Sequence, residues 1–88
     1  MNEVRYVVRL RNSAQRDLDR LPDDVRDRIL NALERLKDDP RPRASLKLEG
    51  TKSQFRLRIG KYRALYSIDR AESTVWVCRI AHRKAAYR

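Results

Sequence analysis

The sequence predicts an α+β domain in which a helical hairpin packs on an antiparallel β-sheet, in the element order β-α-α-β-β-β-β. In the first half of the chain, apolar residues recur at the helical spacing of three and four. After the prolines at positions 40 and 42, apolar and polar residues alternate with the period of two that is typical of strands. A length of 88 residues leaves room for one domain, which we expect to span residues 1–88.

The N-terminal segment predicts a strand followed by a short helix. Residues 4–10 (VRYVVRL) are rich in β-branched and aromatic side chains, as strands are. Asn12 is a suitable helix N-cap, with Gln15 three residues further on. The helix then presents one narrow apolar stripe, formed by Ala14, Leu18 and Leu21.

A second helix is predicted after Pro22. Proline suits a first helical turn, and Asp23 and Asp24 would lie near the positive end of the helix dipole. Apolar residues at spacings of four, four and three form one helical face: Val25, Ile29, Leu33 and Leu36. Pro40 ends the helix, because proline disfavours helical backbone in the residue before it.

Four strands are predicted in the second half. Leu46 and Leu48 alternate with a lysine in the first, and residues 55–59 alternate in the second. A two-residue turn, Gly60-Lys61, leads into a return strand over residues 62–69. A polar turn over residues 70–73 precedes the last strand, over residues 74–80. We expect three residues of these last strands to belong to the core: Tyr66, Trp76 and Cys78. The alternative is a platform on which nucleic-acid bases stack.

The two-residue turn sets the register of its hairpin. It pairs Ile59 with Tyr62, Arg58 with Arg63, and Leu57 with Ala64. One face then carries the apolar set Phe55, Leu57, Ile59, Tyr62, Ala64, Tyr66 and Ile68. The other face carries Arg56, Arg58 and Arg63. Opposed like charges destabilise a sheet, so this cluster favours an anionic ligand such as phosphate; the alternative is a merely hydrated surface.

The charge distribution points to the same half of the chain. Residues 1–40 carry nine basic and nine acidic side chains, whereas residues 41–88 carry thirteen basic and three acidic ones. The whole net charge of +10 therefore lies in the second half. A charge excess confined to half of a domain is typical of a face that binds a polyanion.

Composition excludes several other classes. The single cysteine, Cys78, provides neither a disulfide framework nor a zinc knuckle. The sequence has no apolar run near the roughly 20 residues of a membrane span and no signal-peptide core, so we expect a cytoplasmic protein without a membrane partner. Carboxylates are scarce in the basic half and histidine occurs once, so we expect neither a metal nor another cofactor.

The C-terminal residues include candidates for chemistry on RNA. Cleavage by internal attack requires a base for the 2′-hydroxyl, stabilisation of the phosphorane charge, and an acid for the leaving 5′-oxygen. Arginines suit the second task, while His82 or Tyr87 can contribute to the other two. The alternatives are a surface histidine at a strand end and a tyrosine that anchors the C-terminus on the sheet.

Several motifs together resemble the RelE/ParE toxin superfamily, essentially from end to end. The motifs are Leu18-x-x-Leu21-Pro22, Asp39-Pro40-Arg41-Pro42, Lys47-Leu48-x-Gly50, Phe55-Arg56-Leu57-Arg58-Ile59-Gly60-x-Tyr62-Arg63-x-x-Tyr66-x-Ile68-Asp69 and Ile80-x-His82-Arg83-x-x-x-Tyr87-Arg88. The resemblance implies a RelE-like fold and a toxin of a type II toxin–antitoxin system. It further implies a ribosome-dependent mRNA endoribonuclease that acts in the ribosomal A site and inhibits translation.

The resemblance also implies the roles of individual residues. The catalytic set comprises Arg56, Arg58, Arg63, Arg83 and Tyr87, with His82 adjacent to the motif. Some relatives have lysines at positions 56 and 58; arginine does not act as a base, so that role falls to Tyr87 or His82. The remaining basic residues that we expect to contact RNA are Lys47, Lys52, Lys61, Arg79, Lys84 and Arg88.

Two alternative functions remain open within this superfamily. A ParE-like toxin inhibits DNA gyrase without chemistry, and a degenerate member would be a basic module that binds nucleic acid or a partner. In the toxin interpretations, the resemblance implies a cognate RelB-like antitoxin that wraps the toxin in a hetero-oligomeric complex.

Overall fold

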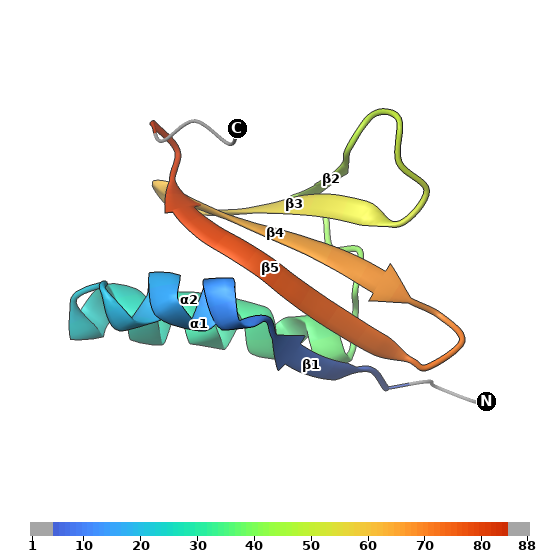
Figure 1. Cartoon of the computed structure of the whole chain (residues 1–88), viewed down its shortest axis with the longest axis horizontal. Coiled ribbons are helices and arrows are strands. Elements are labelled where there is room, and N and C mark those ends of the chain that lie inside the picture. The colour runs from blue at the N-terminus through green and yellow to red at the C-terminus, as the bar shows by residue number, and fades with distance from the viewer. Residues whose placement is uncertain (1–4, 85–88) are drawn as a thin grey trace.

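A computed structural model describes residues 5–84 and shows two helices packed on a five-stranded sheet (Figure 1). The strands follow the order β1-β5-β4-β3-β2 across the sheet. The elements are β1 (Val7–Leu10), α1 (Asn12–Asp19), α2 (Asp23–Glu34), the 3₁₀ turn η1 (Arg35–Lys37), β2 (Ser45–Lys47), β3 (Gln54–Ile59), β4 (Tyr62–Asp69) and β5 (Thr74–His82). The predicted α+β class and element order are confirmed.

The sheet is mixed, whereas the sequence predicted an antiparallel one. Strands β2 to β5 run antiparallel, but β1 pairs with β5 in parallel. A tight turn forces neighbouring strands to reverse direction. Strand β1 has no such turn to β5, because both helices and three strands separate them along the chain. Its direction is therefore set by tertiary packing, which the local sequence pattern of the strand does not determine.

The helix starts differ slightly from their prediction. Asn12 is not the N-cap of α1: the helix begins at Asn12, and Arg11 occupies the cap position without a side-chain cap. The Gln15 side chain bonds forward to Asp19 at 3.0 Å instead of back to the cap. Pro22 similarly precedes α2 as its cap residue.

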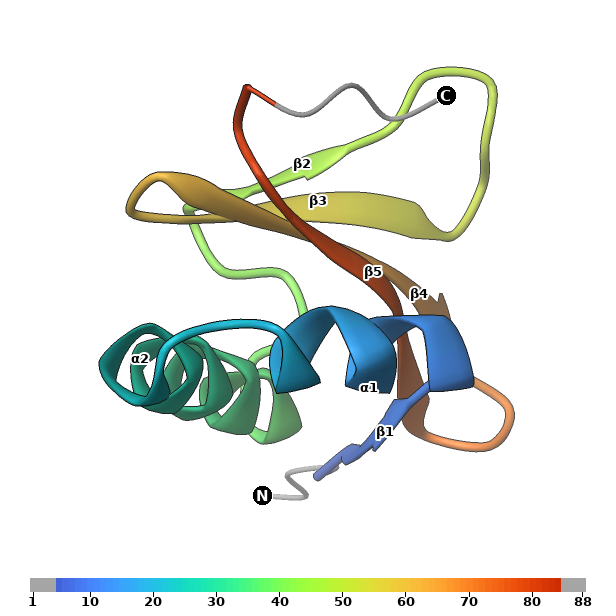
Figure 2. The ribbon, with the colours of Figure 1, turned by 60° about the vertical axis from the view of Figure 1, so that its left-hand side comes forward.

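Figure 2 shows both helices on one side of the sheet. The core lies between the helices and this face. The predicted helical stripes are buried there, with Leu21 and Val25 at the margin. The fully enclosed helical residues are Ala14, Leu18, Ile29, Leu33 and Leu36. Burying each leucine or isoleucine side chain stabilises the fold by about 1.5–3 kcal/mol, so this layer positions the sheet firmly.

An irregularity in β5 changes which side chains face the core. Leu65 pairs with Arg79 but Tyr66 pairs with Val77, so Cys78 is an extra residue in the ladder, a β-bulge. Val77 and Ile80 are both buried, although they are three residues apart. A strand that alternated throughout would have turned Ile80 outward.

The predicted burial of three residues near this bulge is only partly confirmed. Tyr66 belongs to the core, with 1% of its surface exposed. Trp76 and Cys78 are only half-buried and lie outside the core. The reason for Trp76 is that the flanking Val75 and Val77 take the core-facing positions.

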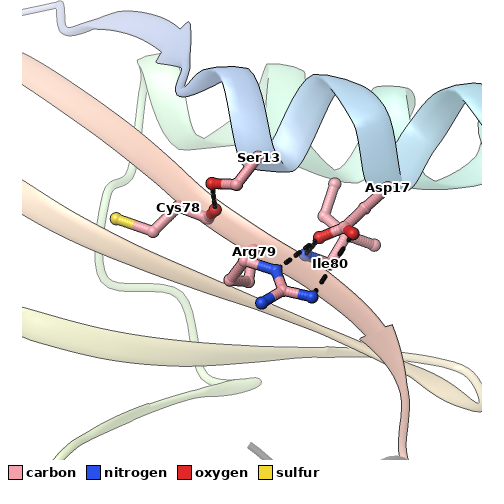
Figure 3. Close-up of polar contacts among 5 residues, drawn as sticks. All are labelled: Ser13, Asp17, Cys78, Arg79 and Ile80. Carbon is pink, nitrogen blue, oxygen red and sulfur yellow. Dashed lines mark hydrogen bonds and ion pairs between the residues drawn. The ribbon is translucent and has the colours of Figure 1, made fainter.

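Side chains of helix α1 form hydrogen bonds with the backbone groups of β5 that lie beyond the end of β1. The last pair between β1 and β5 joins Leu10 to Val77. Further along β5, the Ser13 hydroxyl donates to the Cys78 carbonyl at 2.6 Å, and the Asp17 carboxylate accepts from the Ile80 amide at 2.8 Å (Figure 3). Side chains of α1 thus replace the hydrogen bonds of a neighbouring strand.

Candidate functional site

The β3–β4 hairpin has the register that the sequence predicts. Ile59 pairs with Tyr62, Arg58 with Arg63, and Leu57 with Ala64. Gly60 has φ +58°, the sign that the first central position of a glycine-first hairpin turn requires. The predicted apolar face is buried, with Tyr62 at its margin. Arg56, Arg58 and Arg63 consequently project from the opposite face.

These arginines line one groove of about 410 Å³. We call it the arginine groove; the described residues that line it are Arg43, Ala44, Ser45, Leu46, Arg56, Arg58 and Arg63. Four of these seven described residues are arginines, and none of the seven is acidic. Guanidinium groups remain charged at any physiological pH and present planar, forked donors. The groove is therefore suited to an oxyanion, and phosphate fits that geometry.

Arg43 is a member of the site that the sequence did not indicate. Strand β2 pairs Leu46 with Arg56, and the Arg58 amide donates to the Ala44 carbonyl at 3.2 Å. This pairing brings the segment before β2 alongside β3. Only the register between β2 and β3 could have indicated Arg43. A two-residue turn determines such a register, but the long connection over residues 48–53 does not.

The structure places His82 apart from the arginine groove. Its ring packs edge-on against Tyr62, with ring centroids 5.3 Å apart, and Nδ1 accepts from the Lys84 amide at 3.2 Å. Directly paired residues share a face, and Tyr62 borders the core. The imidazole therefore lies on the core side of the sheet, across from the guanidinium groups.

The residues after β5 return to the hairpin turn. The Arg83 amide donates to the Lys61 carbonyl at 2.7 Å, and Figure 1 shows this end of β5 beside the β3–β4 turn. The side chains of Lys61, Arg83 and Lys84 are exposed near this turn. Tyr87 and Arg88 lie outside the described residues.

The other predicted RNA-binding residues lie elsewhere. Arg79 forms an ion pair with Asp17 on α1, at 2.9 Å (Figure 3). Lys47 and Lys52 line a second cavity, of about 690 Å³, at the far end of the β3–β4 hairpin. The structure thus divides the predicted basic residues among the arginine groove, the hairpin turn, the edge of α1 and this second cavity.

Tyr66 has a shifted pKa, but it lies in the core and not in the arginine groove. Desolvation by burial raises the pKa of its phenol above 10.0, and the hydroxyl donates to the Pro40 carbonyl at 2.7 Å. A phenol that holds its proton this firmly does not serve as a base at neutral pH.

Within residues 5–84, no three His, Cys, Asp or Glu side chains are grouped closely enough to hold a metal ion, and no helix is long and apolar enough to cross a membrane.

Comparison with known proteins places this architecture in one group. The family profile described as the ParE toxin of the type II toxin–antitoxin system parDE matches residues 8–87. Toxin RelG from Mycobacterium tuberculosis is 37% identical, over 94% of this chain and 97% of that protein.

Solved structures agree with that match. The toxin–antitoxin complex RelBE2 from Mycobacterium tuberculosis contains a chain that is 33% identical, with a TM-score of 0.80 over 90% of this chain and 99% of that chain. The archaeal RelE–RelB complex from Pyrococcus horikoshii contains one that is 29% identical, also with a TM-score of 0.80, over 92% and 98%. The match covers the whole fold, including the hairpin that carries the arginine groove, and the chain therefore belongs to the RelE/ParE superfamily of type II toxin–antitoxin toxins.

Proposed function

We propose that this toxin inhibits translation as a ribosome-dependent mRNA endoribonuclease. The observation that carries the proposal is the arginine groove, where the described lining contains four guanidinium groups and no carboxylate side chain. A protein that bound only through apolar contacts would gain nothing from opposing Arg58 to Arg63. The similarity to RelG and to the RelE-type complexes supports the same assignment.

The proposed reaction is an internal transfer at phosphorus. The 2′-oxygen of a nucleotide attacks the adjacent phosphate, the bond to the 5′-oxygen breaks, and a 2′,3′-cyclic phosphate forms. The proton of the 2′-hydroxyl passes to a base, and the leaving 5′-oxygen receives a proton from an acid. The groove arginines stabilise the negative charge that grows on the phosphorane oxygens. No metal takes part in this scheme.

The proton carriers belong to the C-terminal residues. His82 and Tyr87 are the two candidates for the base, because the arginines remain protonated. Arg83 follows β5 beside the hairpin turn, where it can contact the phosphate or orient the leaving group. The position of the His82 ring on the core side favours Tyr87 as the base, with His82 supporting the end of β5.

The partners follow from the same assignment. Both solved relatives are complexes of a toxin with its antitoxin, and we propose a cognate RelB-like antitoxin for this chain. An acidic antitoxin segment across the basic half would block the groove through charge complementarity. The ribosome would supply the A site in which mRNA meets the groove, within the cytoplasm.

A second candidate function rests on the family profile itself, which is that of ParE toxins. A ParE-like protein would inhibit DNA gyrase by binding alone, and the arginine groove would then contact a protein or DNA. A non-toxic basic module is the remaining possibility within the superfamily.

One experiment separates these functions. The chain is induced in cells, and the ends of mRNA are mapped for the wild type and for the variants Arg83→Ala and Tyr87→Phe. We expect codon-phased cleavage in the wild type and a loss of at least about tenfold in each variant. Acid–base groups such as Tyr87 contribute about 10²–10⁴ in rate, and a group that stabilises the transition-state charge, as proposed for Arg83, contributes about 10²–10³. Growth arrest with intact mRNA and damaged DNA would support gyrase inhibition, and the absence of arrest would support the binding module.

A further inference from the structure

The second cavity has the character of a binding site in its own right. Its volume is about 690 Å³, and none of the described residues that line it also lines the arginine groove. We call it the Trp76 cavity. Its cationic lining residues are Arg11, Arg41, Lys47, Lys52 and Arg70. Among the residues that the structure describes, Asp69 is the one acidic lining residue, so this part of the lining carries a formal charge of five minus one, or +4.

The acidic residue is already engaged. An Asp69 carboxylate oxygen accepts a hydrogen bond from the Glu72 amide at 3.0 Å, within the turn between β4 and β5. Its role is local to that turn. The described lining holds five cationic side chains against this one carboxylate, and that excess of positive charge favours an anionic occupant.

Two aromatic rings contribute to the same cavity. The Arg11 guanidinium carbon lies 4.2 Å from the centroid of Trp76, and that of Arg41 lies 5.3 Å from the centroid of Phe55. Phe55 is buried, with 5% of its surface exposed, whereas Trp76 is only half-buried. Trp76 together with Arg11 is thus the flat surface that remains accessible to a ligand.

From these features we infer that the Trp76 cavity binds single-stranded RNA, with phosphates held by the cationic residues and a base stacked at Trp76 and Arg11. Base stacking on aromatic rings combined with a cationic groove is how proteins hold single strands. A docked amphipathic helix would require apolar anchors, but the apolar lining residues Phe55 and Ile68 are buried. An acidic protein segment would pair with the cations but would leave the stacking surface at Trp76 and Arg11 unused.

The Trp76 cavity lies close enough to the arginine groove for one continuous strand of RNA to occupy both. Ser53 in the Trp76 cavity and Arg58 in the arginine groove are five residues apart in the chain that forms β3. This separation corresponds to roughly 16 Å of extended backbone. A strand with phosphates at least about 3.4 Å apart needs no more than about five nucleotides to reach both. The inference rests on the proposed function in that the RNA is the flank of the cleaved message.

The experiment uses the only tryptophan of the chain as its probe. The purified full-length toxin is titrated with a short single-stranded 2′-O-methyl RNA, which cannot be cleaved because its 2′-oxygens are blocked. We expect a saturable change in Trp76 fluorescence. We also expect the salt dependence of binding to weaken in the double variant Lys52→Gln/Arg70→Gln, by about 1.4 in the slope of log K against log salt, from about 0.7 for each lost phosphate contact.

A matched control removes the same charge elsewhere. Arg16 on α1 and Arg35 in η1 are exposed and line neither the arginine groove nor the Trp76 cavity. The variant Arg16→Gln/Arg35→Gln should keep the wild-type slope, and thermal unfolding verifies that both double variants are folded. Equal slopes in the two variants would overturn the inference, as would saturable RNA binding without any change at Trp76. A fluorescence response to the antitoxin but not to RNA would assign the cavity to a protein ligand.

The two proposals can fail separately. If 2′-O-methyl RNA alters Trp76 fluorescence but induced cells show intact mRNA, the cavity binds RNA and the nuclease proposal fails. If mRNA is cleaved while Trp76 stays unaffected by bound RNA, only the cavity inference fails.

Discussion

Arg58 and Arg63 stand directly opposite each other on β3 and β4, an arrangement that opposes stability. Like charges in a directly opposed pair raise the free energy of the folded sheet. The same pair lines the arginine groove, where a bound phosphate would turn the repulsion into attraction. At this scale, the residues that bind the ligand are also a source of local instability.

Replacing Arg58 by glutamine should separate these two effects. Arg58 is exposed, so the variant should fold, and relief of the opposed charge should raise the free energy of unfolding by about 0.2–1 kcal/mol. RNA cleavage should fall, because one phosphate contact is lost. Urea unfolding and mRNA end mapping measure the two quantities. Arg35→Gln, on the helical layer, is the control and should change neither; a less stable Arg58→Gln protein would contradict the interpretation.

Helix α1 and strand β5 form the unit that carries the C-terminal residues toward the hairpin turn. Beyond the end of β1, the edge of β5 is satisfied by Ser13 and Asp17. The Asp17 carboxylate also holds the Arg79 guanidinium, and its side chain is only 13% exposed. The helix thus determines the path of the strand just before His82 and Arg83.

Asp17→Ala should therefore destabilise the protein by about 1–3 kcal/mol, because a half-buried amide loses its acceptor. Asp19→Ala is the matched control on the same helix, since Asp19 is exposed and accepts only from the Gln15 side chain among the described contacts. Urea unfolding gives the free energies, and amide exchange at Ile80 reports the edge directly. Similar losses in both variants would show that the edge contact does not stabilise β5.

One hydrogen bond links the connection between the helical layer and the sheet to the core. The segment after η1 crosses to β2, and there the Tyr66 hydroxyl donates to the Pro40 carbonyl from within the core. Burial raises the pKa of Tyr66 above 10.0. The unfolded chain therefore loses this proton at a lower pH than the folded one. The associated stability is fully present below about pH 10 and is lost as the pH rises through the raised folded pKa.

Tyr66→Phe should change global stability in two ways. At pH 7 the lost hydrogen bond should cost about 0.5–1.5 kcal/mol. Above pH 10, the variant should lose stability less steeply than the wild type, because the buried group no longer titrates. Urea midpoints between pH 7 and pH 11 measure both effects. An unchanged alkaline slope would mean that Tyr66 does not couple ionisation to unfolding.

The parts of this protein that the sequence predicted are governed by local geometry. Helical spacing placed Leu18 and Ile29 in the core, because residues three and four apart share a helix face. The two-residue turn at Gly60 determined the hairpin register, and with it the face shared by Arg56, Arg58 and Arg63. Each of these follows from constraints between residues that are close in the chain.

The tertiary structure decided what depends on distant contacts. The direction of β1 follows from packing against β5, and Arg43 joins the groove only through the register of β2 with β3. The bulge at Cys78 reverses the alternation of β5 and turns His82 toward Tyr62, away from the arginines. Strict alternation predicts side-chain orientation only while every residue has a partner, and one extra residue inverts all that follow. The sequence by itself therefore determined the cluster of cations on the hairpin, and only the folded sheet decided which other side chains join it.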